Sequence, residues 1–164
     1  MSKSNSYPRL PQAQRGTSLL EVLISVLIMA VGLLGIAAMQ ATALRNSQGS
    51  TERSQAVIQS YAIIDAMRAN REQALGGAYN TGGWMCQAPA AGNLSANDRA
   101  SWLRSLRTTI ADDIADASIC GNIDCTAATS ICVVGVRWDE SRTGSTGGTQ
   151  AGSAQQTIQT RVRM

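Results

Sequence analysis

Positions 22–39 restrict the fold of this chain more than any other segment, because they hold eighteen uncharged and mostly apolar residues in succession. A helix rises about 1.5 Å per residue, so the wider stretch 17–44 is long enough to cross a bilayer core of about 30 Å. Its apolar side chains point to all sides of the helix axis, whereas a surface helix of a soluble domain keeps one polar face. We therefore expect a hydrophobic membrane-spanning helix over residues 17–44.

The distribution of charge predicts the orientation of this helix. Residues 1–16 contain Lys3, Arg9 and Arg15 and no acidic residue. By the positive-inside rule, the amino terminus stays in the cytoplasm and the bulk of the chain is exported. We expect a single-pass protein of the inner membrane with its head in the periplasm.

The exported part has no excess of basic over acidic residues. The chain carries a net charge of +3, and all of it lies in residues 1–16, because eleven arginines balance eleven acidic residues beyond that point. A nucleic-acid partner is therefore not expected. An ordinary secretory signal remains the alternative for the apolar run, since Ala37-Ala38-Met39, with Ala41 and Ala43, could imitate a small-residue cleavage site. The run, however, exceeds a usual signal core of about 7 to 15 residues.

Residues 15–21, with the sequence Arg-Gly-Thr-Ser-Leu-Leu-Glu, place one carboxylate at the edge of the apolar helix. This combination resembles the processing site of type IV prepilins, although most members of that family have Phe where this chain has Thr17. The resemblance implies a leader peptide of residues 1–16, cleavage by prepilin peptidase between Gly16 and Thr17, and N-methylation of Thr17.

Glu21 matches the family's assembly glutamate. The resemblance implies that Glu21 pairs with the Thr17 ammonium of a neighbouring subunit when the helix enters a filament. A carboxylate inside a membrane helix is costly, and the cost falls toward the interface. The alternative is therefore a glutamate that lies among lipid headgroups with no partner.

Beyond the membrane segment the pattern becomes amphipathic. Apolar residues, among them Val57, Tyr61 and Met67, recur at helical spacing, so residues 45–75 are expected to continue the first helix to about Ala74. Glycine pairs then open a globular head over residues 76–164.

The head is expected to contain one helix and two strands. Ser95 and Asp98 resemble a capping box at the start of a helix whose apolar face runs as far as Ile114. Residues 131–138 and 156–163 have the composition of strands, and the glycine-rich segment 141–154 between them predicts a long hairpin loop or a segment without fixed structure.

Taken together, residues 67–70 (Met-Arg-Ala-Asn), the helix near Trp102 and the two strands resemble the PilV group of minor pilins, also called type IV pilus modification proteins. The resemblance implies an α+β, pilin-like fold and a role in pilus assembly, initiation or the tip complex, with effects on twitching motility and adhesion. Its implied partners are prepilin peptidase, other minor pilins, the major pilin and, before assembly, inner-membrane lipid. Minor pseudopilins of type II secretion and a tip-displayed adhesin, using the loop around Trp84 or the segment 141–154, are the alternatives.

Four cysteines lie on the exported side, namely Cys86, Cys120, Cys125 and Cys132. An even number in an oxidising compartment favours two disulfides, for which three connectivities exist. We favour Cys86 with Cys120 and Cys125 with Cys132. A zinc site is the alternative, but structural zinc sites usually use C-x-x-C pairs and this chain has none.

Catalysis has little support in the sequence. The chain has no histidine, and its only lysine, Lys3, lies in the leader. Asp112, Asp113 and Asp116 lie close together, but without the ordered ligand spacing of a calcium loop they are expected to form a solvated helix face. We expect neither enzymatic activity nor a bound metal or cofactor.

Overall fold

The computed structural model describes residue 16 and residues 18–141, 145–146, 149–150 and 155–164. The chain divides into two compact units, Met1–Ala41 and Thr42–Met164. Helix α1 (Leu19–Ala69) contributes residues to both units. The predicted long first helix is therefore present, and Gly32 and Gly35 do not interrupt it.

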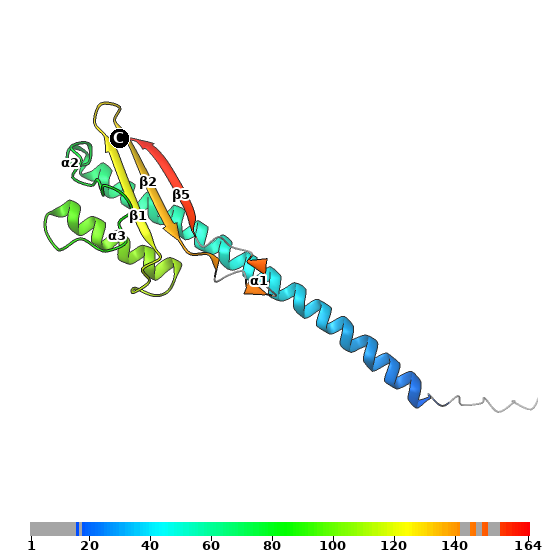
Figure 1. The fold of residues 1–164 in the computed structure, drawn as a ribbon. Helices are drawn as coiled ribbons and strands as arrows, with labels where there is room; N and C mark the ends of the chain where they lie inside the picture. Colours follow the sequence, from blue (N-terminus) through cyan, green and yellow to red (C-terminus); the bar gives the residue numbers. More distant parts are fainter. Residues whose placement is uncertain (1–15, 17, 142–144, 147–148, 151–154) are drawn as a thin grey trace, which may run out of the picture. The chain divides into compact units, whose positions relative to one another are not determined.

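The second unit contains the remaining elements, which are α2 (Arg71–Leu75), α3 (Leu94–Ile110) and five short strands. Strands β1 (Cys120–Thr126), β2 (Ile131–Trp138) and β5 (Gln156–Arg163) form an antiparallel sheet in the order β1-β2-β5 (Figure 1). Strands β3 (Ser145–Thr146) and β4 (Thr149–Gln150) form a separate two-stranded ribbon. The architecture is α+β and pilin-like, as predicted.

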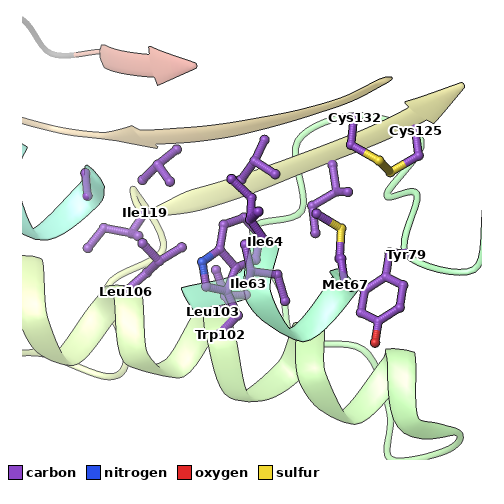
Figure 2. Close-up of a cluster of buried hydrophobic side chains, with 14 of the residues drawn as sticks. Ile63, Ile64, Met67, Tyr79, Trp102, Leu103, Leu106, Ile119, Cys125 and Cys132 are labelled. Carbon is purple, nitrogen blue, oxygen red and sulfur yellow. A yellow bond between two sulfur atoms is a disulfide. The ribbon is translucent and has the colours of Figure 1, made fainter. Parts of the chain in front are cut away.

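One face of the sheet packs on α1 and α3 to form the core of this unit (Figure 2). Its interior is filled by side chains from both helices and from the inward positions of β1 and β2. These are Ala56, Ile63, Ile64 and Met67 of α1, Trp102, Leu103, Leu106 and Ile110 of α3, and Ile123, Cys125, Cys132, Val134, Val136 and Trp138 of the strands. Every second residue of β2 faces this core, because side chains alternate across a strand.

The predicted strands at 131–138 and 156–163 are confirmed as β2 and β5, which pair antiparallel with Trp138 opposite Gln156. Most of the predicted loop 141–154 lies outside the described residues. Strand β1 was not predicted, because its glycine, asparagine and aspartate residues have low strand propensity. Its pairing with β2 supplies the stability that its own sequence lacks.

Three predictions about the helices were wrong. Asn93, and not Ser95, caps α3, because its Oδ1 accepts a 3.0 Å hydrogen bond from the Ala96 backbone N–H while Ser95 is buried. The helix ends at Ile110, so Ile114 is not on its apolar face and is 54% exposed. The first helix stops at Ala69, and Asn70 separates it from α2.

The three aspartates form turns instead of the expected helix face. Asp112 has a positive φ of 52°, which ends the helical geometry after α3. The side chains of Asp113 and Asp116 each accept a 2.8 Å hydrogen bond from the backbone N–H two residues later. Such local bonds stabilise turns in competition with a helix.

The buried face of α1 in the second unit also differs from the predicted stripe. Ile64 and Met67 are buried as expected, but Val57 and Tyr61 are exposed. Small residues, Ala56 and Ser60, occupy the buried positions in their place. Because these side chains are small, α1 can pack closely against the rest of the head at these positions.

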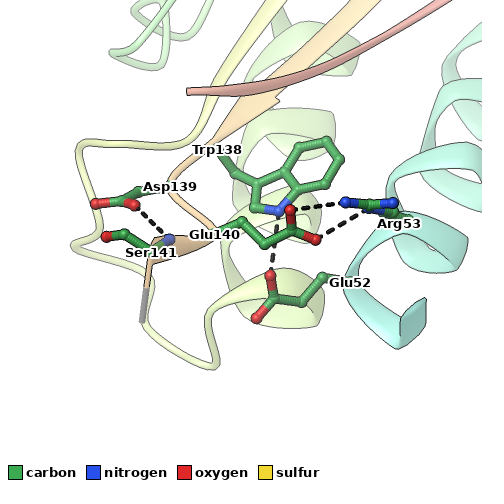
Figure 3. A network of polar contacts seen from close by, with 6 residues as sticks. All are labelled: Glu52, Arg53, Trp138, Asp139, Glu140 and Ser141. Carbon is green, nitrogen blue, oxygen red and sulfur yellow. Dashed lines mark hydrogen bonds and ion pairs between the residues drawn. The ribbon is translucent and has the colours of Figure 1, made fainter. Parts of the chain in front are cut away.

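Two polar contacts tie α1 to the end of β2 (Figure 3). Arg53 donates two hydrogen bonds, of 3.0 and 2.9 Å, to the two carboxylate oxygens of Glu140, which is only 4% exposed. The hydrogen bond to Glu140 raises the pKa of Arg53 above its ordinary value. Beside it, the indole N–H of Trp138 donates to Glu52 at 3.1 Å.

Gly121 of β1 lies directly against the indole ring of Trp102. A Cβ atom at this position would lie 2.3 Å from Cζ3 of Trp102, which is closer than any real contact. We expect Gly121→Ala to reduce the free energy of unfolding by about 1 to 3 kcal/mol through overpacking. Thermal unfolding of the full chain in detergent, followed by the near-UV signal of tryptophan, measures this loss.

Gly92→Ala is the control, because a Cβ there would meet its nearest neighbour, the Ala96 Cβ, at an ordinary 3.7 Å. Its expected effect is within about 0.5 kcal/mol. Equal unfolding temperatures for the two variants would contradict the described packing of Trp102.

Removing Arg53 leaves the buried Glu140 carboxylate without its bidentate partner. We expect Arg53→Ala to cost about 1 to 3 kcal/mol of stability, since hydrogen bonds to charged groups are worth more than neutral ones. Arg68→Ala is the matched control, because Arg68 pairs with Asp65 on an exposed helix surface, where such pairs are worth about 0.2 to 0.5 kcal/mol. A larger loss from Arg68→Ala in chemical or thermal unfolding would contradict this ranking.

Candidate functional site

The first turn of α1 places Glu21 at the start of the apolar helix. The carbonyl oxygen of Ser18 accepts hydrogen bonds from the backbone N–H groups of Glu21 (2.9 Å) and Val22 (3.3 Å), and so begins the helix. The hydroxyl of Ser25 donates to the carbonyl oxygen of Glu21 at 2.5 Å. A carboxylate in the first turn also interacts favourably with the positive end of the helix dipole.

The side chain of Glu21 is exposed, and among the described residues no hydrogen bond or ion pair reaches its carboxylate. Leu20 and Val22, its sequence neighbours, are also exposed. An acid in such apolar surroundings gains most from a cationic partner that another molecule supplies. Gly16 is exposed, while Thr17 lies outside the described residues, so cleavage and methylation at this bond stay predictions.

The part of α1 that lies in the first unit, residues 19–41, presents an apolar surface that no other described residue covers. Its large apolar side chains are between 50% and 80% exposed. They are Leu19, Leu20, Val22, Leu23, Ile24, Val26, Leu27, Ile28, Met29, Val31, Leu33, Leu34, Ile36 and Met39. Within the described residues, α1 is the one helix that is long and apolar enough to cross a membrane. Such a surface requires lipid or other apolar helices around it.

Disulfide bonds in the second unit join Cys86 to Cys120 and Cys125 to Cys132. These are the pairs that the sequence favoured. Cys125 and Cys132 are direct partners across β1 and β2, so their bond crosslinks the hairpin on the core side of the sheet. The other bond fastens the segment after α2 to the start of β1. Both constrain a head whose apolar core is small.

A stack of Trp84 and Arg137 beside the Cys86–Cys120 bond was not predicted. The Arg137 guanidinium lies 4.9 Å from the ring centroid of Trp84, and its Nη2 lies 3.4 Å from the sulfur of Cys120. The sequence contains one sign of this stack, because a glycine inside a strand, here Gly135, often marks a place where another group approaches the backbone closely. A Cβ at Gly135 would lie 3.1 Å from the Trp84 ring. Trp84 is therefore partly occupied by packing and is not simply presented to solvent.

No group of three or more histidine, cysteine, aspartate or glutamate side chains that could hold a metal ion occurs in the described part of the chain. All four cysteines are in disulfides, so the structure does not favour the alternative zinc site. Burial, together with a hydrogen bond to Asp98, raises the pKa of the Tyr79 hydroxyl.

Residues 11–37 match the family model described as the prokaryotic N-terminal methylation motif. No curated protein and no solved structure matches the chain significantly. The motif implies processing by prepilin peptidase and assembly with other pilins, and it points to a structural protein rather than an enzyme. Together with the apolar half of α1, it supports a membrane-anchored protein of the type IV pilin or pseudopilin kind.

Proposed function

We propose that this protein is a minor pilin of the type IV pilus, similar to the PilV group. Residues 17–44 hold it in the inner membrane, prepilin peptidase removes residues 1–16, and the mature chain then enters a filament with other minor pilins and the major pilin. The observation that carries the proposal is the methylation motif at residues 11–37, which includes the first half of the apolar helical segment, whose large apolar side chains are exposed. Such a helix can exchange lipid for the helical core of a polymer.

Glu21 has a direct electrostatic role in this proposal. Cleavage between Gly16 and Thr17 creates an α-amino group, whose ordinary pKa of about 7.7 to 8.0 keeps it largely protonated at neutral pH. The Glu21 carboxylate finds no partner among the described residues of its own chain. In a water-excluded bundle of helices, an ion pair with the Thr17 ammonium of a neighbour satisfies two charges that would each be costly alone.

The described contacts of the head stabilise its own fold, and the head serves as a stable scaffold in this proposal. Its largest buried side chains are used for packing, and its polar contacts, such as Arg53 with Glu140, join one element to another. The alternative of a tip adhesin that binds a ligand through the loop around Trp84 has less support, because Trp84 is only partly exposed and is stacked on Arg137. We therefore place assembly and initiation first, with effects on twitching motility and adhesion following from altered piliation.

Minor pseudopilins remain the second candidate, because the same methylation motif serves both kinds of protein. Deletion of the gene in its native host separates them. We expect loss of twitching motility with protein secretion intact. Intact twitching with loss of type II secretion would replace the minor pilin with the pseudopilin.

Glu21→Ala tests the assembly role. We expect normal removal of residues 1–16 but more than a tenfold drop in the amount of protein in sheared pilus fractions, because the neighbour's Thr17 ammonium is left unpaired in the helical core. Immunoblots of membrane and pilus fractions measure both steps. Glu72→Ala, the same change at an exposed position of α2, is the control and should enter pili normally. Normal incorporation of Glu21→Ala would contradict the ion pair.

A further inference from the structure

The two edges of the sheet β1-β2-β5 differ in how their backbone groups are satisfied. On the β1 edge, the backbone N–H and C=O of Gly121 pair with those of Met85, at 3.0 and 2.7 Å. Two residues further along β1, the backbone C=O of Ile123 accepts a 3.0 Å hydrogen bond from the Thr81 N–H, and the backbone N–H of Ile123 donates one of 3.0 Å to the Thr81 hydroxyl. The segment before α3 thus covers this edge.

The same cover extends to the last outward position of β1. The Asn80 side chain accepts a 2.8 Å hydrogen bond from the Cys125 N–H and donates one of 3.2 Å to its C=O. The amide group therefore imitates the backbone of a neighbouring strand. The backbone N–H and C=O groups of all three outward-facing residues of β1 thus form hydrogen bonds within the chain, so this edge has no free backbone groups for a further strand.

Strand β5 forms the opposite edge, beside β2 (Figure 1). The Met164 N–H donates to the Ser130 carbonyl at 2.9 Å. In an antiparallel pair of strands, residues point their backbone N–H and C=O groups alternately toward the partner strand and away from it, so this bond shows which residues of β5 face β2. Residues 156, 158, 160 and 162 direct their backbone groups toward β2, and residues 157, 159, 161 and 163 direct theirs away from it. In the part of the chain that the structure describes, no hydrogen bond reaches these four outward-directed backbone positions.

The side chains along this free edge define the chemistry of a partner. Arg161 and Arg163 are exposed, and neither forms a salt bridge with another described residue. On the other face of the same strand, Ile158 and Val162 pack against the core but are only partly buried. An added strand would therefore find cationic groups on one face and uncovered apolar surface on the other.

We propose that β5 is a docking site for an extended strand of a partner protein in which acidic residues, placed opposite Arg161 and Arg163, alternate with apolar residues. An added strand would form hydrogen bonds with the backbone groups at the four outward-directed positions of β5. Its acidic side chains would face the two arginines, and its apolar side chains would lie beside Ile158 and Val162 on the other face. A second copy of β5 is disfavoured as the occupant, because it would bring two more arginines to the same edge. The inference goes beyond the proposed role in pili and does not depend on it.

The test uses the full-length chain in detergent micelles and a labelled probe peptide, Glu-Val-Glu-Val-Thr-Val-Thr-Val, blocked at both ends. Its control, Lys-Val-Lys-Val-Thr-Val-Thr-Val, differs only in charge. We expect fluorescence anisotropy to give at least tenfold tighter binding of the glutamate peptide at low salt, which corresponds to about 1.4 kcal/mol. Hydrogen exchange should slow in residues 156–163 on binding.

Two variants separate strand addition from simple charge attraction. Gln159→Pro removes an N–H that points away from β2, so it should block the probe without breaking the internal ladder, whereas Gln159→Ala should bind normally. Reversal of both charges, Arg161→Glu with Arg163→Glu, should transfer the preference to the lysine peptide. Unchanged binding by Gln159→Pro, with its native near-UV signal retained, would overturn the proposal. Concentration-dependent self-association that this proline abolishes would also overturn it, in favour of a second copy.

Discussion

The apolar surface of the first half of α1, with Glu21 as its only charged side chain among residues 19–41, is the constraint on which the rest of the molecule depends. Burial of apolar area is favourable by roughly 25 cal/mol per Å², and the described chain does not cover the large apolar residues of this segment. The surface therefore has to be buried by other molecules. Lipid can satisfy its apolar side chains, but lipid offers no fixed cation for the carboxylate. A polymer of similar helices can offer both, and this is the physical basis of the proposal that the segment is first an anchor and then an assembly element.

In the second unit, a small sheet packs on two helices, and several contacts hold these layers together. Its core is narrow, and Gly121 permits the close approach of Trp102 that fills it. Crosslinks supplement this packing: one disulfide closes the β1–β2 hairpin, and the other fixes the segment that covers the β1 edge. The Arg53–Glu140 contact joins α1 to the end of β2. One edge of the sheet is closed by the chain itself, while no described residue forms a hydrogen bond with the outward-directed backbone positions of β5.

Sequence predicted well those features that depend on local pattern. The β-branched residues of β2 and the alternation in β5 predicted both strands at their observed bounds, and the apolar run predicted the first helix. Features that depend on contacts between distant residues were missed. Strand β1 has a poor strand sequence and is stabilised by its neighbours. The end of α3 was placed too late because Asp112, Asp113 and Asp116 form turns, and the Trp84–Arg137 stack requires the fold before the two residues can meet. The role of Glu21 is a third kind of case, because its expected partner is on another molecule.

In the proposed function, residues 1–16 form a leader, and its removal lets the membrane-anchored chain become a filament subunit. Intact mass and amino-terminal sequencing of the protein, isolated from membranes of cells with active prepilin peptidase, test it most directly. We expect a chain that begins at Thr17 and carries one methyl group on its α-amino nitrogen. A chain that still begins at Met1 in such cells would contradict it.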